Sequence, residues 1–324
     1  MGASSALAAA VPVLWKATTA TADAQSSAVT ADTRSFTAGR FALEIDGVLA
    51  GFLQSFEGGS AEAEVVVEPL AAGQAAPRKH IGGVKYEDIT ISCGTGMSKH
   101  FYQWIHDCVQ GTPTRQTGAV ADYVYLKYRL NFANALLTEV GFPALDAASK
   151  DAAKMTIKFA PEFTRQATPA NRPASPASTM PWLASRFLLE IDGLDCSHVS
   201  KIEALVVKQK LVDNPTGGQG GNEVEPASLE IPNLVISLPE ADVSTFQAWF
   251  DDFVIKGNNG QDREKNGRLS WLSSNGKVVL GTLDLANLGI FKLEPDTDPA
   301  LQGIRRVKAE MYCETMSFNF NATA

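Results

Sequence analysis

The strongest constraint on the fold of this 324-residue chain is an internal repeat. Residues 40–47 read Arg-Phe-Ala-Leu-Glu-Ile-Asp-Gly, and residues 186–193 repeat them with one change. A period near 145 residues is far longer than the roughly 20–50 residues of a solenoid repeat, so the chain is predicted to hold two copies of one domain. Three more matches keep the same order: residues 88–92 with 233–237, 101–104 with 246–249, and 133–134 with 286–287.

The repeat and the composition around it divide the chain into four predicted segments. Residues 1–39 are rich in Ala, Ser and Thr and are expected to form an arm without a core of its own. Residues 40–165 are the first copy and residues 186–324 the second. Between them, residues 166–185 contain four prolines. Because proline restricts φ and removes an amide donor, this segment is predicted to be an extended linker.

Composition excludes several classes of protein. With 45% hydrophobic and 20% charged residues, each copy can bury a core. The net charge of −8 argues against a duplex-DNA binder, and no segment approaches the roughly 18 apolar residues of a membrane span. The first copy carries 12 Lys+Arg against 14 Asp+Glu, the second 13 against 20. The two copies therefore differ in surface charge.

Hydrophobic periodicity predicts that each copy is mainly β with one helix. Phe41, Leu43 and Ile45 alternate with small or charged residues, as one face of a strand does. The helix of each copy carries an apolar face that ends at a glycine, Gly111 or Gly257. One helix among about six strands predicts an antiparallel β-barrel, closed or nearly closed, with the helix against it. The helical faces are Met97, Phe101, Trp104, Ile105 and Cys108, and Val243, Phe246, Trp249, Phe250 and Phe253.

Other strands and two loops are predicted at matching places in the copies. The loops, residues 69–80 and 212–226, are expected at contacts with partners, because long loops on rigid scaffolds often carry interactions. The second loop includes the glycine-rich residues 217–221. The predicted strands are 63–68, 88–92, 123–132, 136–140 and 155–159 in the first copy, and 201–211, 233–238, 267–272, 278–285 and 307–320 in the second.

Two segments of the first copy resemble the tail-tube protein family of contractile phages and phage-tail-like contractile injection systems. One is residues 79–91 (Lys-His-Ile-Gly-Gly-Val-Lys-Tyr-Glu-Asp-Ile-Thr-Ile) with the Trp104 helix behind them, and the other is residues 137–159. The resemblance covers residues 40–165. The second copy matches more weakly and lacks the Pro-Ala-Leu-Asp stretch of residues 143–146. The resemblance implies small β-barrels that join edge to edge into six-fold rings, which stack into a hollow tube, and it carries no catalytic residues.

Residues that could carry chemistry have simpler interpretations. His106 and Cys108 are two apart on a helix and do not share a face, so a Cys–His couple is not predicted. Cys196 and His198 lack a second ligand pair for zinc. The four cysteines are expected to be buried free thiols, and Trp104 and Trp249 to be core anchors. No catalytic, cofactor-binding or metal-binding residue is assigned, and no enzyme is expected.

The expected function is a structural component of a contractile phage-tail-like injection apparatus that forms, caps or initiates the inner tube by ring assembly. The alternative is a two-domain β-barrel binding or adaptor module, for cargo or glycan, that does not form rings. Three chains per ring, with pseudo-six-fold symmetry, are favoured over six because each chain supplies two domains. Further expected partners are other tube, baseplate, hub or sheath proteins, with assembly in the cytoplasm into a tail-like particle.

Overall fold

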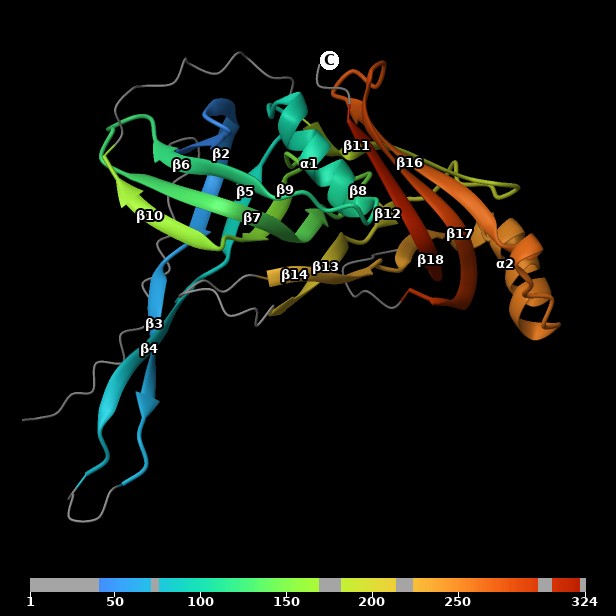
Figure 1. Ribbon diagram of the computed structural model, residues 1–324. Coiled ribbons are helices and arrows are strands. Elements are labelled where there is room, and N and C mark those ends of the chain that lie inside the picture. Colours follow the sequence, from blue (N-terminus) through green and yellow to red (C-terminus); the bar gives the residue numbers. More distant parts are fainter. Residues whose placement is uncertain (1–40, 71–75, 169–181, 214–223, 297–304, 321–324) are drawn as a thin grey trace, which may run out of the picture. The chain divides into compact units, whose positions relative to one another are not determined.

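The computed structural model describes residues 41–70, 76–168, 182–213, 224–296 and 305–320 (Figure 1). Within these residues, antiparallel strands predominate and two α-helices occur, α1 (Lys99–Val109) and α2 (Ser244–Phe250). The predicted arm at residues 1–39, most of the predicted linker and the glycine-rich residues 217–221 lie outside the described ranges.

Six strands of the first copy close a barrel. They follow the order β7-β6-β1-β2-β5-β9, and β9 pairs back with β7. The barrel predicted from periodicity is therefore confirmed. A seventh strand, β10 (Phe163–Ala167), continues β9 along the same edge of β7. The barrel strands are β1 (Phe41–Ile45), β2 (Val48–Gly58), β5 (Ile89–Cys93), β6 (Gln116–Asp122), β7 (Arg129–Phe142) and β9 (Met155–Ala160).

The second copy forms a sheet in the order β11-β16-β17-β18-β15-β12-β8, which is nearly closed. Its last member, β8 (Leu145–Asp146), comes from the end of the first copy and pairs with β12. A bridge between Ala152 and Leu183 brings the two ends of this sheet near each other. The remaining strands are β11 (Trp182–Ile191), β12 (Lys201–Ile202), β15 (Leu234–Pro239), β16 (Lys265–Ser273), β17 (Val279–Pro295) and β18 (Arg306–Phe320).

Each copy also contains a β-hairpin between its second and third barrel strands, which are β2 and β5 in the first copy and β12 and β15 in the second. The hairpin of the first copy is β3 (Ala61–Val67) with β4 (Lys79–Tyr86), and that of the second is β13 (Leu205–Asp213) with β14 (Val224–Glu230). Their registers match: Glu62 lies opposite Lys85, and Lys208 lies opposite Glu230. The predicted loops at residues 69–80 and 212–226 are thus shorter than expected, because strand pairing continues into both.

The equivalence of the copies extends to individual polar contacts. Asn134 and Asn287 both adopt positive φ, 51° and 55°, on β7 and β17. This conformation is uncommon outside glycine but tolerated by asparagine, so its recurrence fixes the alignment of the two strands. The surrounding hydrogen bonds recur too: Asn134 N to Thr117 and its Nδ2 to Glu162, and Asn287 N to Asn266 and its Nδ2 to Glu314.

Helix α1 begins and ends as its sequence predicts. Ser98 Oγ accepts a hydrogen bond from the amide of Phe101, and Gly111 adopts φ 73° after the last turn. Trp104 is 1% exposed, and its indole nitrogen donates to Thr114 O at 2.9 Å. Both predicted aromatic anchors are confirmed as buried, since Trp249 on α2 is 8% exposed.

Several strand predictions were wrong or incomplete. The predicted strand at residues 123–132 begins only at Arg129. The buried Asp122 carboxylate accepts hydrogen bonds from the backbone amides of Val124 and Tyr125, and these bonds form a turn before the strand. Strands β2 and β6 were not predicted. The register shifts between Leu43 and Glu44 where β1 pairs with β2, which disturbs the simple alternation that predicts strands.

Candidate functional site

The two copies are joined by continuous β-sheet. Strand β13 of the second copy pairs antiparallel with the last residues of β7 in the first copy, from Leu205 opposite Phe142 to Lys208 opposite Glu139. Leu205 and Val207 are 2% and 1% exposed. Sheet hydrogen bonds and apolar burial therefore act together here, and we call this contact the inter-copy joint. It is the main candidate for a functional surface.

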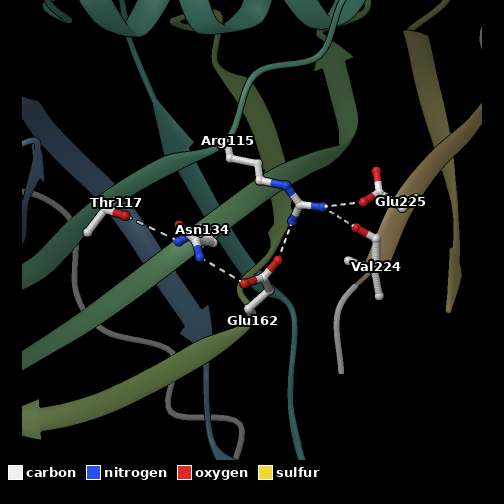
Figure 2. Close-up of polar contacts among 6 residues, drawn as sticks. All are labelled: Arg115, Thr117, Asn134, Glu162, Val224 and Glu225. Carbon is white, nitrogen blue, oxygen red and sulfur yellow. Dashed lines mark hydrogen bonds and ion pairs between the residues drawn. The ribbon is translucent and has the colours of Figure 1, made fainter. Parts of the chain in front are cut away.

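Arg115 fixes the hairpin of the second copy to the first barrel (Figure 2). Its guanidinium donates to the Glu162 carboxylate and to Val224 O, the latter at 2.5 Å, and it lies 3.4 Å from the Glu225 carboxylate. Glu162 is itself held by Asn134, from which its other oxygen accepts a hydrogen bond at 2.9 Å. A planar guanidinium can bind a carboxylate and a carbonyl at once, which positions a strand end as well as attracting it.

The helix of the first copy forms the other side of the joint. His106 Nδ1 lies 2.6 Å from Phe318 O on β18, and the ring of Tyr102 stacks on Phe320 with centroids 3.9 Å apart. Phe142 stacks on Trp271 of β16 at 5.3 Å. Aromatic pairs of this kind add to the free energy of the apolar surface they bury. The joint therefore has a strand part and a helix part.

The hairpin of the first copy has no such partner among the described residues. Strands β3 and β4 form a separate two-stranded sheet, which extends away from the first barrel in Figure 1. Its apolar side chains are exposed: Val65 by 60%, Val67 by 53% and Ile81 by 70%. An isolated two-stranded hairpin with exposed valines is typical of a segment that pairs with another sheet edge.

The β7 edge is covered by β13, but the equivalent edge in the second copy, on β17, is open among the described residues. Within the described chain, β16 pairs with β17 no further than Leu288, so residues 289–295 of β17 are unpaired on that side. Phe291 is 41% exposed. Leu293 is partly exposed, whereas its counterpart Val140 on β7 is fully buried. The uncovered hairpin and the uncovered edge are thus the counterparts of the two halves of the inter-copy joint.

The structure shows the surroundings of the residues considered for chemistry. Burial raises the pKa of the Cys93 and Cys108 thiols to about 12 and that of Cys313 to about 11, so these thiols stay protonated and unreactive. His106 contacts the backbone of β18 and does not face Cys108. The predicted free thiols are confirmed, with three of the four buried.

In the described part of the chain, His198 and the neighbours of Cys196 make ion pairs and hydrogen bonds with nearby acidic and hydroxyl groups. His198 Nδ1 lies 3.3 Å from Asp242, and both Asp195 and Ser197 bond locally. The hydrogen bonds from Ser197 lower the pKa of Asp195. No group of three metal-ligating side chains occurs within the described residues. In the same residues, every helix is too short or too polar to cross a membrane.

Sequence reasoning missed the residues that hold the joint. Arg115 follows the helix with no periodic signal around it, and Glu162 stands between two strands. The recurring Ala-Asn pair at residues 133–134 and 286–287 was the available signal, because it marks the strand position beside which Glu162 and Arg115 lie. The Ala-Asn pair could identify this strand position, but it could not identify the β13–β14 hairpin that binds there, because that hairpin comes from the other copy.

Comparison with known proteins agrees with the geometry. Residues 37–163 match the family described as T4-like virus tail tube protein gp19. No curated protein matches the chain.

Among solved structures, likenesses occur to proteins of contractile injection systems. A chain of the anti-feeding prophage baseplate is 14% identical, with a TM-score of 0.36, covering 47% of this chain and 100% of its own. A chain of the PVC sheath–tube complex is 19% identical, with a TM-score of 0.34, and the match covers 40% of this chain and 88% of that chain. A chain of the anti-feeding prophage tube-terminating cap is 16% identical, with a TM-score of 0.34, and the match covers 46% of this chain and 97% of that chain. TM-scores this low carry no argument about this chain.

The fold conclusion rests on the family match and on the pairing of the strands. The matched residues include all six strands of the first barrel, and the second copy repeats its strand registers and its positive-φ asparagine. Residues 37–163 thus match the T4-like virus tail tube protein family, and the described residues form one closed and one nearly closed antiparallel barrel of the same plan.

Proposed function

We propose that this protein is a structural, non-enzymatic component of a contractile phage-tail-like injection apparatus, which forms, caps or initiates the inner tube by assembling into rings. The observation that carries the proposal is the inter-copy joint. One tube-like barrel accepts the hairpin of another along a sheet edge, and among the described residues the β3–β4 hairpin of the first copy and the β17 edge of the second remain uncovered. Such a head-to-tail contact generates a closed ring when its rotation closes.

The proposed ring contains three chains and six barrels. The inter-copy joint is a continuous sheet, which favours neighbouring positions within one ring over successive layers of a stack. Alternation of two unlike copies gives pseudo-six-fold symmetry, and it suits a chain whose halves carry −2 and −7 charges. The partners would be further tube rings and baseplate, hub or sheath proteins. Assembly would take place in the cytoplasm before the protein becomes part of a tail-like particle.

Electron microscopy of the purified chain, combined with native mass measurement, tests this proposal. Rings with a mass three times the 34.6 kDa of the chain are expected. Rings of six chains would retain the tube function but contradict the pseudo-hexamer. A chain that stays monomeric at high concentration and with added tube protein would contradict ring assembly and favour the binding or adaptor module.

A further inference from the structure

We infer that the β3–β4 hairpin of one chain pairs with the β17 edge of the next chain, at residues 291–295, in the register that the inter-copy joint displays. The occupant of each surface is therefore a second copy of this chain. This inference rests on the proposed ring but names the contact that closes it. It is drawn from three properties of the chain: register, exposure and charge.

The register follows from the equivalence of the two copies. In the inter-copy joint, Val207 lies opposite Val140. The matched hairpin registers place Ala61 at the position of Val207, and the matched asparagines place Leu293 at the position of Val140. The inferred contact therefore sets Ala61 opposite Leu293. One residue further along it sets Glu62 opposite Lys292.

The helix part of the joint has an uncovered counterpart as well. Val109, near the end of α1, is 2% exposed. The equivalent Val254, in the π-helix Asp251–Ile255 that follows α2, is 39% exposed, and the adjacent Ile255 is 70% exposed. Burial of two such aliphatic side chains against the β10 edge of the next chain would add to the strand pairing. The second copy therefore exposes counterparts of both the strand part and the helix part of the inter-copy joint.

The first charge pair is inverted between the two contacts. Lys208 of the β13–β14 hairpin lies opposite Glu139 of β7 in the inter-copy joint. At the equivalent positions, the β3 hairpin carries Glu62 and the β17 edge carries Lys292. Each hairpin thus carries the charge opposite to that of the edge it joins: Lys208 for Glu139 of β7, and Glu62 for Lys292 of β17. Opposite charges directly across antiparallel strands stabilise the pairing.

The second charge pair is inverted in the same way. Arg115 lies 3.4 Å from the carboxylate of Glu225, at the start of β14. The alignment through Asn134 and Asn287 puts Glu264 at the position of Arg115, and the hairpin registers put His80 at the position of Glu225, beside Lys79. An acidic side chain on the second copy would therefore meet a basic strand end of the next chain.

These inversions also reject the wrong pairing. If the β3–β4 hairpin docked on the first copy of another chain, Glu62 would face Glu139, and Lys79 would face Arg115. Like charges across an interface disfavour that partner, so the copies must alternate around the ring. The inversion supplies specificity for the second copy as well as attraction to it.

Disulfide cross-linking tests the inferred register. The variant with Ala61→Cys and Leu293→Cys should give covalent dimers and trimers on oxidation, because directly opposite residues lie within disulfide range. The matched control, Ala63→Cys with Leu293→Cys, is two residues out of register on the same face and should give little product. The pair Val207→Cys with Val140→Cys should link within one chain, which shows that the chemistry works at this register.

Three outcomes separate the inference from the proposed function. Cross-linked chains with the Ala61 pair, but not the Ala63 pair, support the inferred contact. Rings in the microscope without that cross-link overturn the contact and leave ring assembly standing. Absence of both rings and cross-links, while the pair within one chain links normally, overturns the contact and the proposed ring together.

Discussion

At the scale of single residues, the two equivalent tryptophans are held differently. Trp104 is almost fully buried and its indole nitrogen is hydrogen-bonded, whereas the buried Nε1 of Trp249 has no partner among the described residues. Lys265 lies over the ring of Trp249, 5.5 Å from its centroid. The first helix is therefore anchored by packing and a hydrogen bond, and the second by packing and a cation.

Replacing these rings should destabilise the protein unequally. Trp104→Ala is expected to lower the free energy of unfolding by about 3–5 kcal/mol, because it leaves a cavity and an unpaired Thr114 carbonyl. Trp249→Ala is expected to cost about 2–4 kcal/mol, since its ring is slightly exposed. Chemical denaturation measures both, with the exposed Val48→Ala as the control. Equal stability of Trp104→Ala and the native chain would show that the helix does not depend on this anchor.

Arg115 should matter for the attachment of the hairpin more than for the barrel. Arg115→Ala leaves the Glu162 carboxylate without its cation and is expected to cost about 1–3 kcal/mol. Hydrogen exchange should become faster in β14 than in β1 or β5, because the hairpin loses its clamp. Arg263→Ala is the matched control, since Arg263 and its partner Asp262 are 59% and 80% exposed. Unchanged exchange in β14 would contradict the role given to Arg115.

The partly exposed thiol of Cys196 should react slowly near neutral pH. Burial first, then Asp195 and Glu190, raise the pKa of Cys196 to about 11, despite a backbone hydrogen bond that lowers it. The reactive thiolate is therefore scarce at pH 8, and alkylation should be on the order of a hundredfold slower than for an ordinary thiol. The rate should rise with pH up to about 11. Iodoacetamide labelling measures this, with the denatured chain as reference, and fast labelling at pH 8 would contradict it.

At the scale of elements, the same hairpin occurs in two environments. The β13–β14 hairpin buries Leu205 and Val207 in the inter-copy joint, while the β3–β4 hairpin leaves its valines exposed. The base of the exposed hairpin is closed by a hydrogen bond from Glu87 N to Ser60 O at 2.9 Å. The first barrel therefore ends at this base and does not depend on the strands beyond it.

Shortening the two hairpins should have opposite consequences. Replacement of residues 62–85 by a two-residue Asn-Gly turn should leave the melting temperature nearly unchanged but abolish rings, because the described residues of this segment are mostly exposed. The equivalent replacement of residues 208–230 should destabilise the chain, since it removes Lys208 opposite Glu139 and the contacts of Arg115 with Val224 and Glu225. Calorimetry and electron microscopy give the two readouts. Rings formed by the first variant would exclude the β3–β4 hairpin from assembly.

At the scale of the whole molecule, charge reversal can count the chains in a ring. Glu62→Lys and Lys292→Glu should each weaken assembly, by about 0.5–2 kcal/mol per contact, and the double variant should restore it. In a mixture of the two single variants, complementary contacts form only between unlike chains. A fully alternating ring therefore needs an even number of chains.

Three chains cannot alternate, so the mixture should assemble poorly while the double variant assembles normally. Native mass measurement of the mixture and of the double variant decides the point, with thermal unfolding of each variant as the control for folding. Restoration of complete rings in the mixture, with equal numbers of both chains, would establish an even ring and rule out three chains.

Much of each barrel was determined by the sequence alone. Alternation in residues 41–45, the apolar helix faces and the glycines behind them depend on neighbours a few positions apart, so their consequences can be read along the chain. The repeat determined that both halves share one plan. Strands β2 and β6 could not be predicted, because a bulge and a buried aspartate turn interrupt the local pattern.

Only the tertiary structure decided how the copies are joined. The sequence does not indicate that β13 leaves its own barrel to pair with β7, because a strand has the same alternation whichever edge it joins. Arg115, Glu162 and Val224 become a site only when segments 47 and 109 residues apart meet. Local periodicity reports which face of an element is buried, whereas partner choice depends on edges and charges that the folded chain alone brings together.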